Sequence, residues 1–193
     1  MKLTEHVKYW FAMLLISMVL LMAGASIFFN LFPHSHKETG LEKIGETVSE
    51  IETTLSGFTN ETKKNNYVFL TFSLASIIFY NNAKLNLLFS IPFLGLGFYL
   101  YAVVLTGVIG RYISEIIVGD NWFLFMFLKI LSAPHTYVEL LSYSIVVFES
   151  LYLSLKISKR NVEKSDLVIY FFALLLSFGL LYLAAVLEVA LII

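Results

Sequence analysis

Residues 167–193 read LVIYFFALLLSFGLLYLAAVLEVALII, and Glu188 is the only charged residue in this run of 27. About 20 predominantly apolar residues in a helix cross the hydrocarbon core of a bilayer, so the run predicts a membrane span. The composition agrees, because 59% of the 193 residues are hydrophobic and only 14% are charged, whereas soluble domains carry charge at about a quarter of their positions. The sequence therefore predicts an all-α, polytopic membrane protein.

Four further spans are predicted upstream. Pro134 suits the first position of a helix, where its missing N–H leaves no hydrogen bond unmade, and the apolar pattern after it extends to Leu155. Three uncharged runs come earlier, at residues 9–32, 65–83 and 85–110. Together these segments predict a bundle of about five transmembrane helices embedded in the lipid bilayer.

Two segments admit a second interpretation. Ala23-Gly24-Ala25 fits a signal-peptidase site, but we favour an uncleaved helix because residues 27–29 continue the apolar run beyond that point. Residues 122–132 begin with an aromatic stretch that suits an interfacial or re-entrant piece. A separate crossing there would raise the number of spans to six and move the C-terminus to the other side.

In residues 33–66, between the first two apolar runs, the composition changes from mainly apolar to mainly polar and charged. Apolar side chains recur there at spacings of three and four residues, which predicts one amphipathic helix; they are Leu41, Ile44, Val48, Ile51, Leu55 and Phe58. Its narrow apolar stripe needs cover from the membrane spans, a second copy or another protein. The expected domains are an N-terminal transmembrane helix in residues 1–32, this external segment, and a membrane domain in residues 67–193.

Basic residues in short loops mark the cytoplasmic side of a membrane. The loop before the last span carries four of them, at Lys156, Lys159, Arg160 and Lys164. With five crossings in a cell membrane, the N-terminus is then cytoplasmic, and residues 33–66 and the C-terminus are external.

Several functions are disfavoured by what the sequence lacks. The net charge of −1 argues against a nucleic-acid partner, because such binding needs a surplus of clustered Lys and Arg. There are no cysteines, which excludes disulfides and thiolate chemistry. No H-E-x-x-H, P-loop or G-x-S-x-G motif occurs either. We therefore expect a protein that is not an enzyme and that needs no cofactor.

Ionisable side chains inside a membrane cost about 2.5 to 3.5 kcal/mol each on insertion scales, and they usually have partners or functions. His135 and Glu188 lie about 20 residues from the basic loop, near 30 Å at 1.5 Å per residue. Glu139 is one turn from His135. We expect a polar cluster toward the external side, formed by Arg111, Glu115, His135, Glu139 and Glu188. A polar stripe on one face of the fourth span comprises His135, Glu139, Ser142 and Glu149.

Three interpretations of this cluster are open. In the first, Arg111 neutralises a glutamate and the remaining groups hydrogen-bond, so that the network holds the helices together. In the second, His135, Glu139 and Glu188 bind a divalent metal such as Zn²⁺. In the third, the titratable groups relay protons or ions. His34 and His36 form another candidate metal pair at the membrane surface.

Several motifs resemble the stage II sporulation protein M (SpoIIM) family over residues 66–193. They are Asn81-Asn82, the glycine-punctuated run after this pair, Pro134-His135 with Glu139-Leu140, and Ala184-Ala185-Val186-Leu187-Glu188. By this resemblance the family positions are Asn81, Asn82, Pro134, His135, Glu139 and Glu188. Thr136 departs from the pattern where the family has glycine, and Glu149 stands where it tends to have a small residue.

The resemblance implies a five-span membrane protein without known catalytic activity. In spore-forming bacteria such proteins work with cell-wall hydrolases, and relatives occur in organisms that form no spores. We expect a scaffold or partner-binding component of a membrane complex. Its partner is either a second copy of the chain, in a homo-oligomer of which a dimer is the simplest form, or another envelope protein. The alternative is a transporter or channel for protons, metal ions or a small solute that uses the His/Glu cluster.

Overall fold

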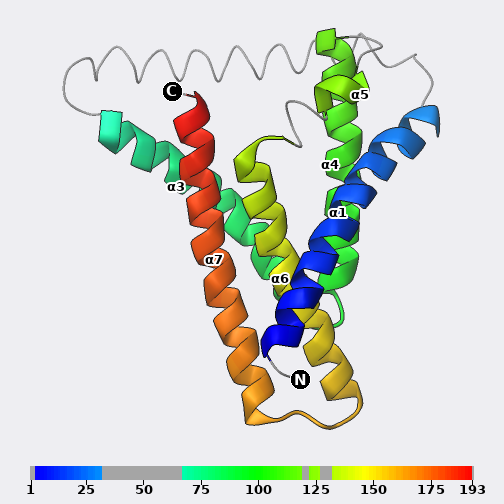
Figure 1. Cartoon of the computed structure of the whole chain (residues 1–193), viewed down its shortest axis with the longest axis vertical. Coiled ribbons are helices and arrows are strands. Elements are labelled where there is room, and N and C mark those ends of the chain that lie inside the picture. The colour runs from blue at the N-terminus through cyan, green and yellow to red at the C-terminus, as the bar shows by residue number, and fades with distance from the viewer. Residues whose placement is uncertain (1–2, 32–66, 119–121, 127–131, 193) are drawn as a thin grey trace.

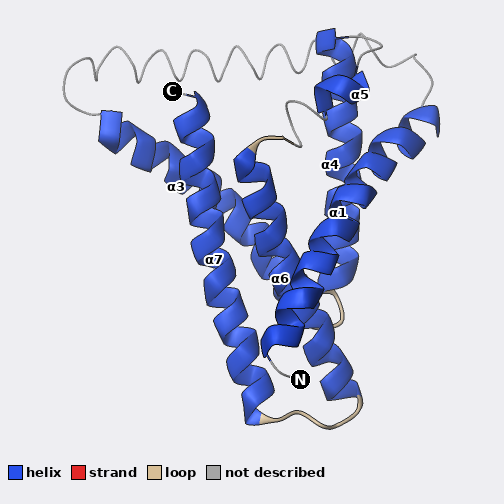
Figure 2. Ribbon diagram, viewed as in Figure 1, coloured by secondary structure: helices blue, strands red, loops and turns tan. Residues whose placement is uncertain are grey.

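The chain folds into a bundle of helices. The computed structural model describes residues 3–31, 67–118, 122–126 and 132–192. Five long helices occur in this part, together with the short α5 (Figures 1 and 2); they are α1 (Leu3–Leu31), α3 (Tyr67–Ser90), α4 (Gly95–Val118), α5 (Trp122–Phe125), α6 (Pro134–Ser158) and α7 (Lys164–Ile192). The all-α prediction is confirmed. The predicted amphipathic segment 33–66, which includes His34 and His36, lies outside the described residues.

Four of the described helices are long and apolar enough to cross a membrane, as expected for a multi-pass membrane protein. These spans are Thr4–Ser26, Gly95–Ser114, Pro134–Ser158 and Lys164–Leu191. The helix α3 is not among them, because its second half carries three asparagines and a lysine, at Asn81, Asn82, Lys84 and Asn86.

The helix α6 forms the centre of the bundle. It packs against α1, α3, α4 and α7, and Figure 1 shows it between the α3–α7 side and the α1–α4 side. Within its membrane-spanning window 61% of the residues are buried, compared with 17 to 33% in the other three spans. Buried serines on several faces allow this, because small side chains let helices approach closely; they are Ser142, Ser144, Ser150 and Ser154.

A tight turn at residues 91–94 separates α3 from α4. The sequence-based boundary at Lys84 was wrong, since α3 continues to Ser90, and the run 85–110 is divided between two helices. Pro92 has no N–H to continue the helical ladder, and Phe93 adopts a left-handed backbone with φ of 69°. Two α6 serines hold the turn: Phe93 N donates to Ser154 Oγ at 2.7 Å, and Ser150 Oγ donates to the Ile91 carbonyl at 2.9 Å.

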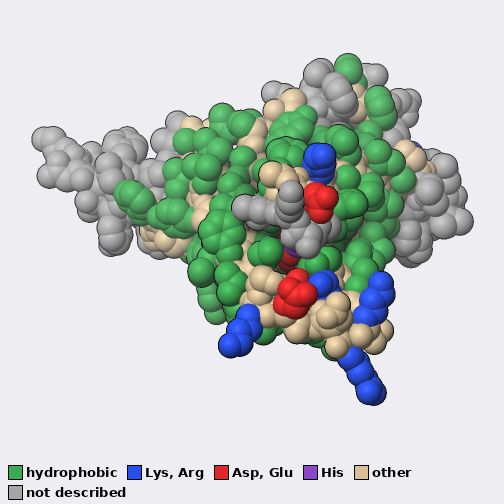
Figure 3. Space-filling view, turned by 60° about the horizontal axis from the view of Figure 1, so that its bottom comes forward, with side chains coloured by type: hydrophobic (Ala, Val, Ile, Leu, Met, Phe, Trp, Pro, Cys, Tyr) green, Lys and Arg blue, Asp and Glu red, His purple; other side chains and the backbone are tan. Residues whose placement is uncertain are grey.

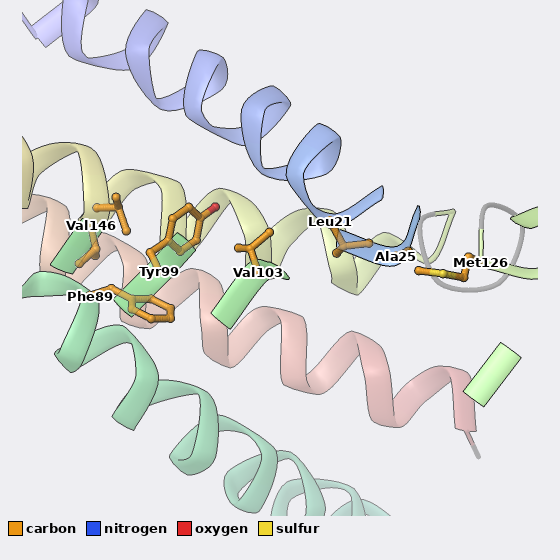
Figure 4. Close-up of a cluster of buried hydrophobic side chains, with 8 residues drawn as sticks. Leu21, Ala25, Phe89, Tyr99, Val103, Met126 and Val146 are labelled. Atoms are coloured by element: carbon orange, nitrogen blue, oxygen red, sulfur yellow. The ribbon is translucent and has the colours of Figure 1, made fainter. Parts of the chain in front are cut away.

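The helices α1 and α4 pack closely because glycines lie at their contact. A Cβ added to Gly107 would lie 2.1 Å from the Leu21 carbonyl oxygen, and one added to Gly24 would lie 2.8 Å from that of Val104. Beside this contact the apolar core continues through Leu21, Phe89, Tyr99, Val103 and Val146, shown in Figure 4. Every long described helix except α7 contributes a buried residue to this core.

Charge and hydrophobicity are separated along the molecule. The N-terminus and the α6–α7 connection lie at one end, and the C-terminus lies at the other (Figure 1). Figure 3 shows several Lys and Arg side chains gathered at the first end, below a largely hydrophobic surface. This arrangement matches that of a bundle whose basic end meets water and whose sides meet lipid.

Candidate functional site

A cavity of about 250 Å³ lies between α3, α4 and α6, with Leu21 of α1 also lining it. The six side chains around it that carry a hydroxyl, amide or carboxyl group are Asn82, Tyr99, Thr106, Thr136, Glu139 and Tyr143. Apolar residues from the same helices complete the wall, among them Leu85, Phe89 and Val103. The cavity therefore combines a carboxyl group with aromatic and aliphatic walls, and it lies partly between two candidate membrane spans, Gly95–Ser114 and Pro134–Ser158.

Glu139 is the acidic group of this cavity. Asn82 Nδ2 of α3 donates a hydrogen bond to Glu139 Oε1 of α6. Glu188 of α7 is near enough to interact electrostatically with Glu139. The structure thus brings together three residues that the sequence proposed as site positions, and it places the fourth and fifth predicted spans, α6 and α7, side by side.

The remaining members of the predicted external cluster lie differently. Arg111 Nη1 donates to the Ala25 carbonyl of α1 at 3.0 Å. His135 Nδ1 is buried and has no hydrogen-bond partner in the part of the chain that the structure describes. The side chain of Glu115 lies outside the described residues.

The predicted metal ligands do not form a compact group. Among residues 3–31, 67–118, 122–126 and 132–192, no three His, Asp or Glu side chains lie close enough together to hold a metal ion. His135, Glu139 and Glu188 are all within these ranges. His135 therefore does not complete a three-residue metal site with Glu139 and Glu188.

Glu149 belongs to a second polar site, nearer the end that holds the N-terminus. Its Oε1 lies 2.6 Å from His6 Nδ1 and accepts a hydrogen bond from Trp10 Nε1 at 2.8 Å. His6 and Glu149 are 0% and 1% exposed. Tyr152 makes an edge contact with the His6 ring at 5.0 Å between centroids. We call His6, Trp10 and Glu149 the α1–α6 triad.

His6 and Trp10 were missed in the sequence analysis. His6 precedes the first apolar run, and Trp10 lies within it as one apolar residue among many. A usable signal was present, because His6 and Trp10 are spaced four residues apart and so share one face of a helix. Which helix that face meets could not be known without the packing of α1 on α6.

A buried group of hydroxyls lies between the two sites. Ser17 of α1 contacts Tyr99 of α4, and Ser144 Oγ of α6 lies 3.5 Å from both hydroxyl oxygens. Apolar residues surround this group, including Phe89, Val146 and Val147, all at most 2% exposed. Figure 4 shows Phe89, Tyr99 and Val146 in this packed region.

The polar residues predicted as a stripe on one face of α6 therefore meet three different neighbouring helices. Glu139 meets Asn82 of α3, Ser142 Oγ donates to the Ser177 carbonyl of α7 at 2.9 Å, and Glu149 meets α1. A further contact that the sequence analysis did not propose joins α3 to α7, where Asn86 Nδ2 donates to Ser177 Oγ at 2.7 Å. Asn81, the other member of the asparagine pair, is exposed.

The comparisons with known proteins identify no relative. The sequence matches no family model, and neither the curated proteins nor the solved structures give a match.

Proposed function

We propose that the chain is a non-enzymatic membrane scaffold of the kind implied by its resemblance to the SpoIIM family, acting as a partner-binding component of a membrane complex. The observation that carries the proposal is that its intramembrane acids contact other helices of the same bundle. Glu149 is held by His6 and Trp10, and Glu139 by Asn82. Polar contacts of this type fix how membrane helices pack.

The separation of the two acidic sites supports a scaffold over a relay. A proton or ion moving between Glu139 and Glu149 would have to pass a closely packed region, in which Phe89, Val146 and Val147 surround a small group of hydroxyls. Hydroxyl groups are present there, but Ser144 Oγ donates to the Leu140 carbonyl of its own helix at 2.6 Å. The packing between the two acids therefore favours a scaffold, in which the helices keep one arrangement, over a relay.

The resemblance gains support from the contacts among its own motif positions. Asn82, Glu139 and Glu188 come from three segments far apart in the sequence, yet Glu139 interacts with both of the others. Residues that share a motif because they hold one site are expected to meet in this way.

The orientation belongs to the same proposal. The N-terminus and the basic α6–α7 loop lie at the same end of the bundle (Figure 1), and basic loops face the cytoplasm. We therefore propose a cell-membrane protein with its N-terminus in the cytoplasm and its C-terminus outside.

Reconstitution tests the scaffold proposal against its alternative. The full chain is placed in vesicles loaded with pH- and ion-sensitive dyes, and gradients of protons, alkali cations and divalent cations are applied. A scaffold gives the leak of empty vesicles. A transporter or channel gives flux above that leak, and Glu139→Gln and Glu188→Gln abolish it.

The alternative function is a transporter or channel for protons, metal ions or a small solute. The cavity at Glu139 is the observation that favours it, because an acidic group beside an opening at membrane depth is common in transport proteins. Flux that depends on Glu139 would establish this alternative and remove the scaffold proposal.

A further inference from the structure

We propose that the cavity between α3, α4 and α6 binds a small organic ammonium group, either a free amine or quaternary ammonium compound or the corresponding headgroup of a lipid. This inference goes beyond the scaffold proposal and does not require it, because a scaffold and a transporter could both contain such a site. It rests on the charge, the walls and the position of the cavity.

The charge at the cavity calls for a cation. Glu139 lines it and Glu188 is near enough to interact with Glu139. The ion pairs found among the described residues join other side chains, His6 with Glu149 and Lys156 with Asp166. Asn82 donates one hydrogen bond to Glu139, but an amide carries no charge, so the ionised form of this carboxyl group would still need a cation beside it. A bound cation would supply the missing charge, since isolated carboxylates are costly at this depth.

The walls favour an organic cation over a bare metal ion. Three aromatic residues line the cavity, and Phe89 packs edge-on against both of the others, with ring centroids 5.3 Å from Tyr99 and 5.2 Å from Tyr143. Aromatic rings attract ammonium groups, and quaternary ammonium ligands are often held by such residues. Among the described residues, no three His, Asp or Glu side chains are grouped so that they could hold a metal ion, and Glu139 is the one carboxyl group in the lining of the cavity.

The size and position of the cavity fit the same ligand. A volume of about 250 Å³ is larger than a metal ion needs and smaller than a typical drug-sized pocket. Two residues of its lining, Leu85 and Thr106, are exposed on the side of the bundle. A ligand can therefore enter from the surrounding lipid, as a headgroup would, or reach the site as a small solute.

Calorimetric titration of the purified full chain in phospholipid-free detergent tests the free ligand. The probes are tetramethylammonium chloride and ethanolammonium chloride, and sodium chloride at equal ionic strength is the reference. We expect saturable binding of at least one ammonium probe and none of sodium. Glu139→Gln should weaken it by about tenfold or more, as should Tyr143→Leu, because each removes a main source of cation attraction.

Two matched variants separate this effect from general damage to the bundle. Glu163→Gln makes the same substitution at an exposed position in the α6–α7 loop and should bind the probes like the wild type. Tyr143→Phe keeps the ring but removes the hydroxyl group, so it should retain most of the affinity that Tyr143→Leu loses. Gel filtration and circular dichroism show which variants are folded.

Native mass spectrometry from nanodiscs tests the lipid source. The discs contain equal amounts of phosphatidylcholine and phosphatidylglycerol, which differ in whether the headgroup carries an ammonium. Retention of phosphatidylcholine that is lost in Glu139→Gln supports the headgroup as the ligand. Binding of a free probe with equal retention of both lipids supports a small solute.

The proposal is overturned if neither arm shows saturable, ammonium-dependent binding to the wild-type chain, whatever the variants do. It is also overturned if folded Glu139→Gln binds the probes as tightly as the wild type. A protonated Glu139 that serves only to hydrogen-bond Asn82 would give the first of these results. If Glu139→Gln does not fold, the contrast between Tyr143→Leu and Tyr143→Phe decides.

Discussion

Glu149 is the most enclosed carboxyl group in the described part of the bundle, and its two partners both come from the first eight residues of α1. His6 Nδ1 and Trp10 Nε1 approach the same oxygen, Oε1. A carboxylate can accept both bonds only if His6 carries its proton on Nδ1. The α1–α6 triad thus fixes the rotation of α1 on α6, because a turn of α1 about its axis would remove both donors together.

A double-mutant cycle measures this coupling. His6→Ala or Glu149→Ala alone should lower the free energy of unfolding by about 3 kcal/mol, because each leaves a buried polar partner unpaired. The double variant should lower the free energy of unfolding by less than the sum of the two single effects. Unfolding is followed by circular dichroism in mixed micelles as the fraction of sodium dodecyl sulfate rises. Strictly additive effects would contradict a direct contact between the two side chains.

Asn82 offers a second test with a matched neighbour. Asn82→Ala should destabilise the bundle by about 1 to 2 kcal/mol, because it removes the hydrogen bond to Glu139. Asn81→Ala should change stability by less than about 0.5 kcal/mol, since this adjacent asparagine is exposed. The same unfolding assay compares them. Equal losses would show that Asn82 acts through the helix backbone and not through Glu139.

Only some of these side chains could be predicted from the sequence. Glu139 and Glu188 stood out because charges are rare within apolar runs, and Asn82 entered through the family resemblance. His6 did not stand out, since it precedes the apolar run and resembles an ordinary residue of a cytoplasmic head. Helical periodicity says which residues share a face of α6, but the neighbour that each face meets depends on the packing of five helices.

Among the helices, α1 and α4 make the contact most sensitive to side-chain size. Gly107→Ala should lower the free energy of unfolding by about 2 kcal/mol or more, because the new Cβ would lie 2.1 Å from the Leu21 carbonyl oxygen and push the helices apart. Gly97→Ala on the same helix meets no atom within 4 Å. It should be neutral or stabilising by about 0.5 kcal/mol, since alanine favours helix. If both substitutions lower the free energy of unfolding by similar amounts, close packing at Gly107 is contradicted.

The turn between α3 and α4 depends on α6. Ser154→Ala should cost about 1 to 2 kcal/mol, because it removes the acceptor of the Phe93 N–H. Ser158→Ala, one turn further along α6 at an exposed position, is the control and should change stability by less than about 0.5 kcal/mol. Thermal unfolding in detergent compares the two. An unchanged Ser154→Ala variant would mean that the turn is held without this hydrogen bond.

The helical boundaries were only partly predictable. Hydropathy found the long runs that became α1, α6 and α7, since each is predominantly apolar over the width of a bilayer. It placed the limit between the second and third runs at Lys84, where charge interrupts the sequence. The helix ends before residues 91–94 instead, because Pro92 and the serines of α6 favour a turn there. A single lysine does not end a helix.

For the whole molecule, the sequence predicted the class of fold better than the identity of the site. Apolar composition is a property of the entire chain and requires a membrane bundle whatever the details of packing. The cavity has no such signal, because its walls come from α3, α4 and α6 and most of its lining is ordinary apolar sequence. Phe89 and Tyr99, for example, became neighbours only through the turn that joins their helices.

The orientation of the bundle can be tested directly because the chain has no cysteine. Single cysteines are introduced by Asn161→Cys in the α6–α7 loop and by Ser132→Cys before α6, both at exposed positions. Since α6 lies between them and basic loops stay in the cytoplasm, a membrane-impermeant maleimide should label Ser132→Cys in intact cells and Asn161→Cys only after permeabilisation. The reverse pattern would invert the proposed topology. Labelling of both in intact cells would mean that α6 does not cross the membrane.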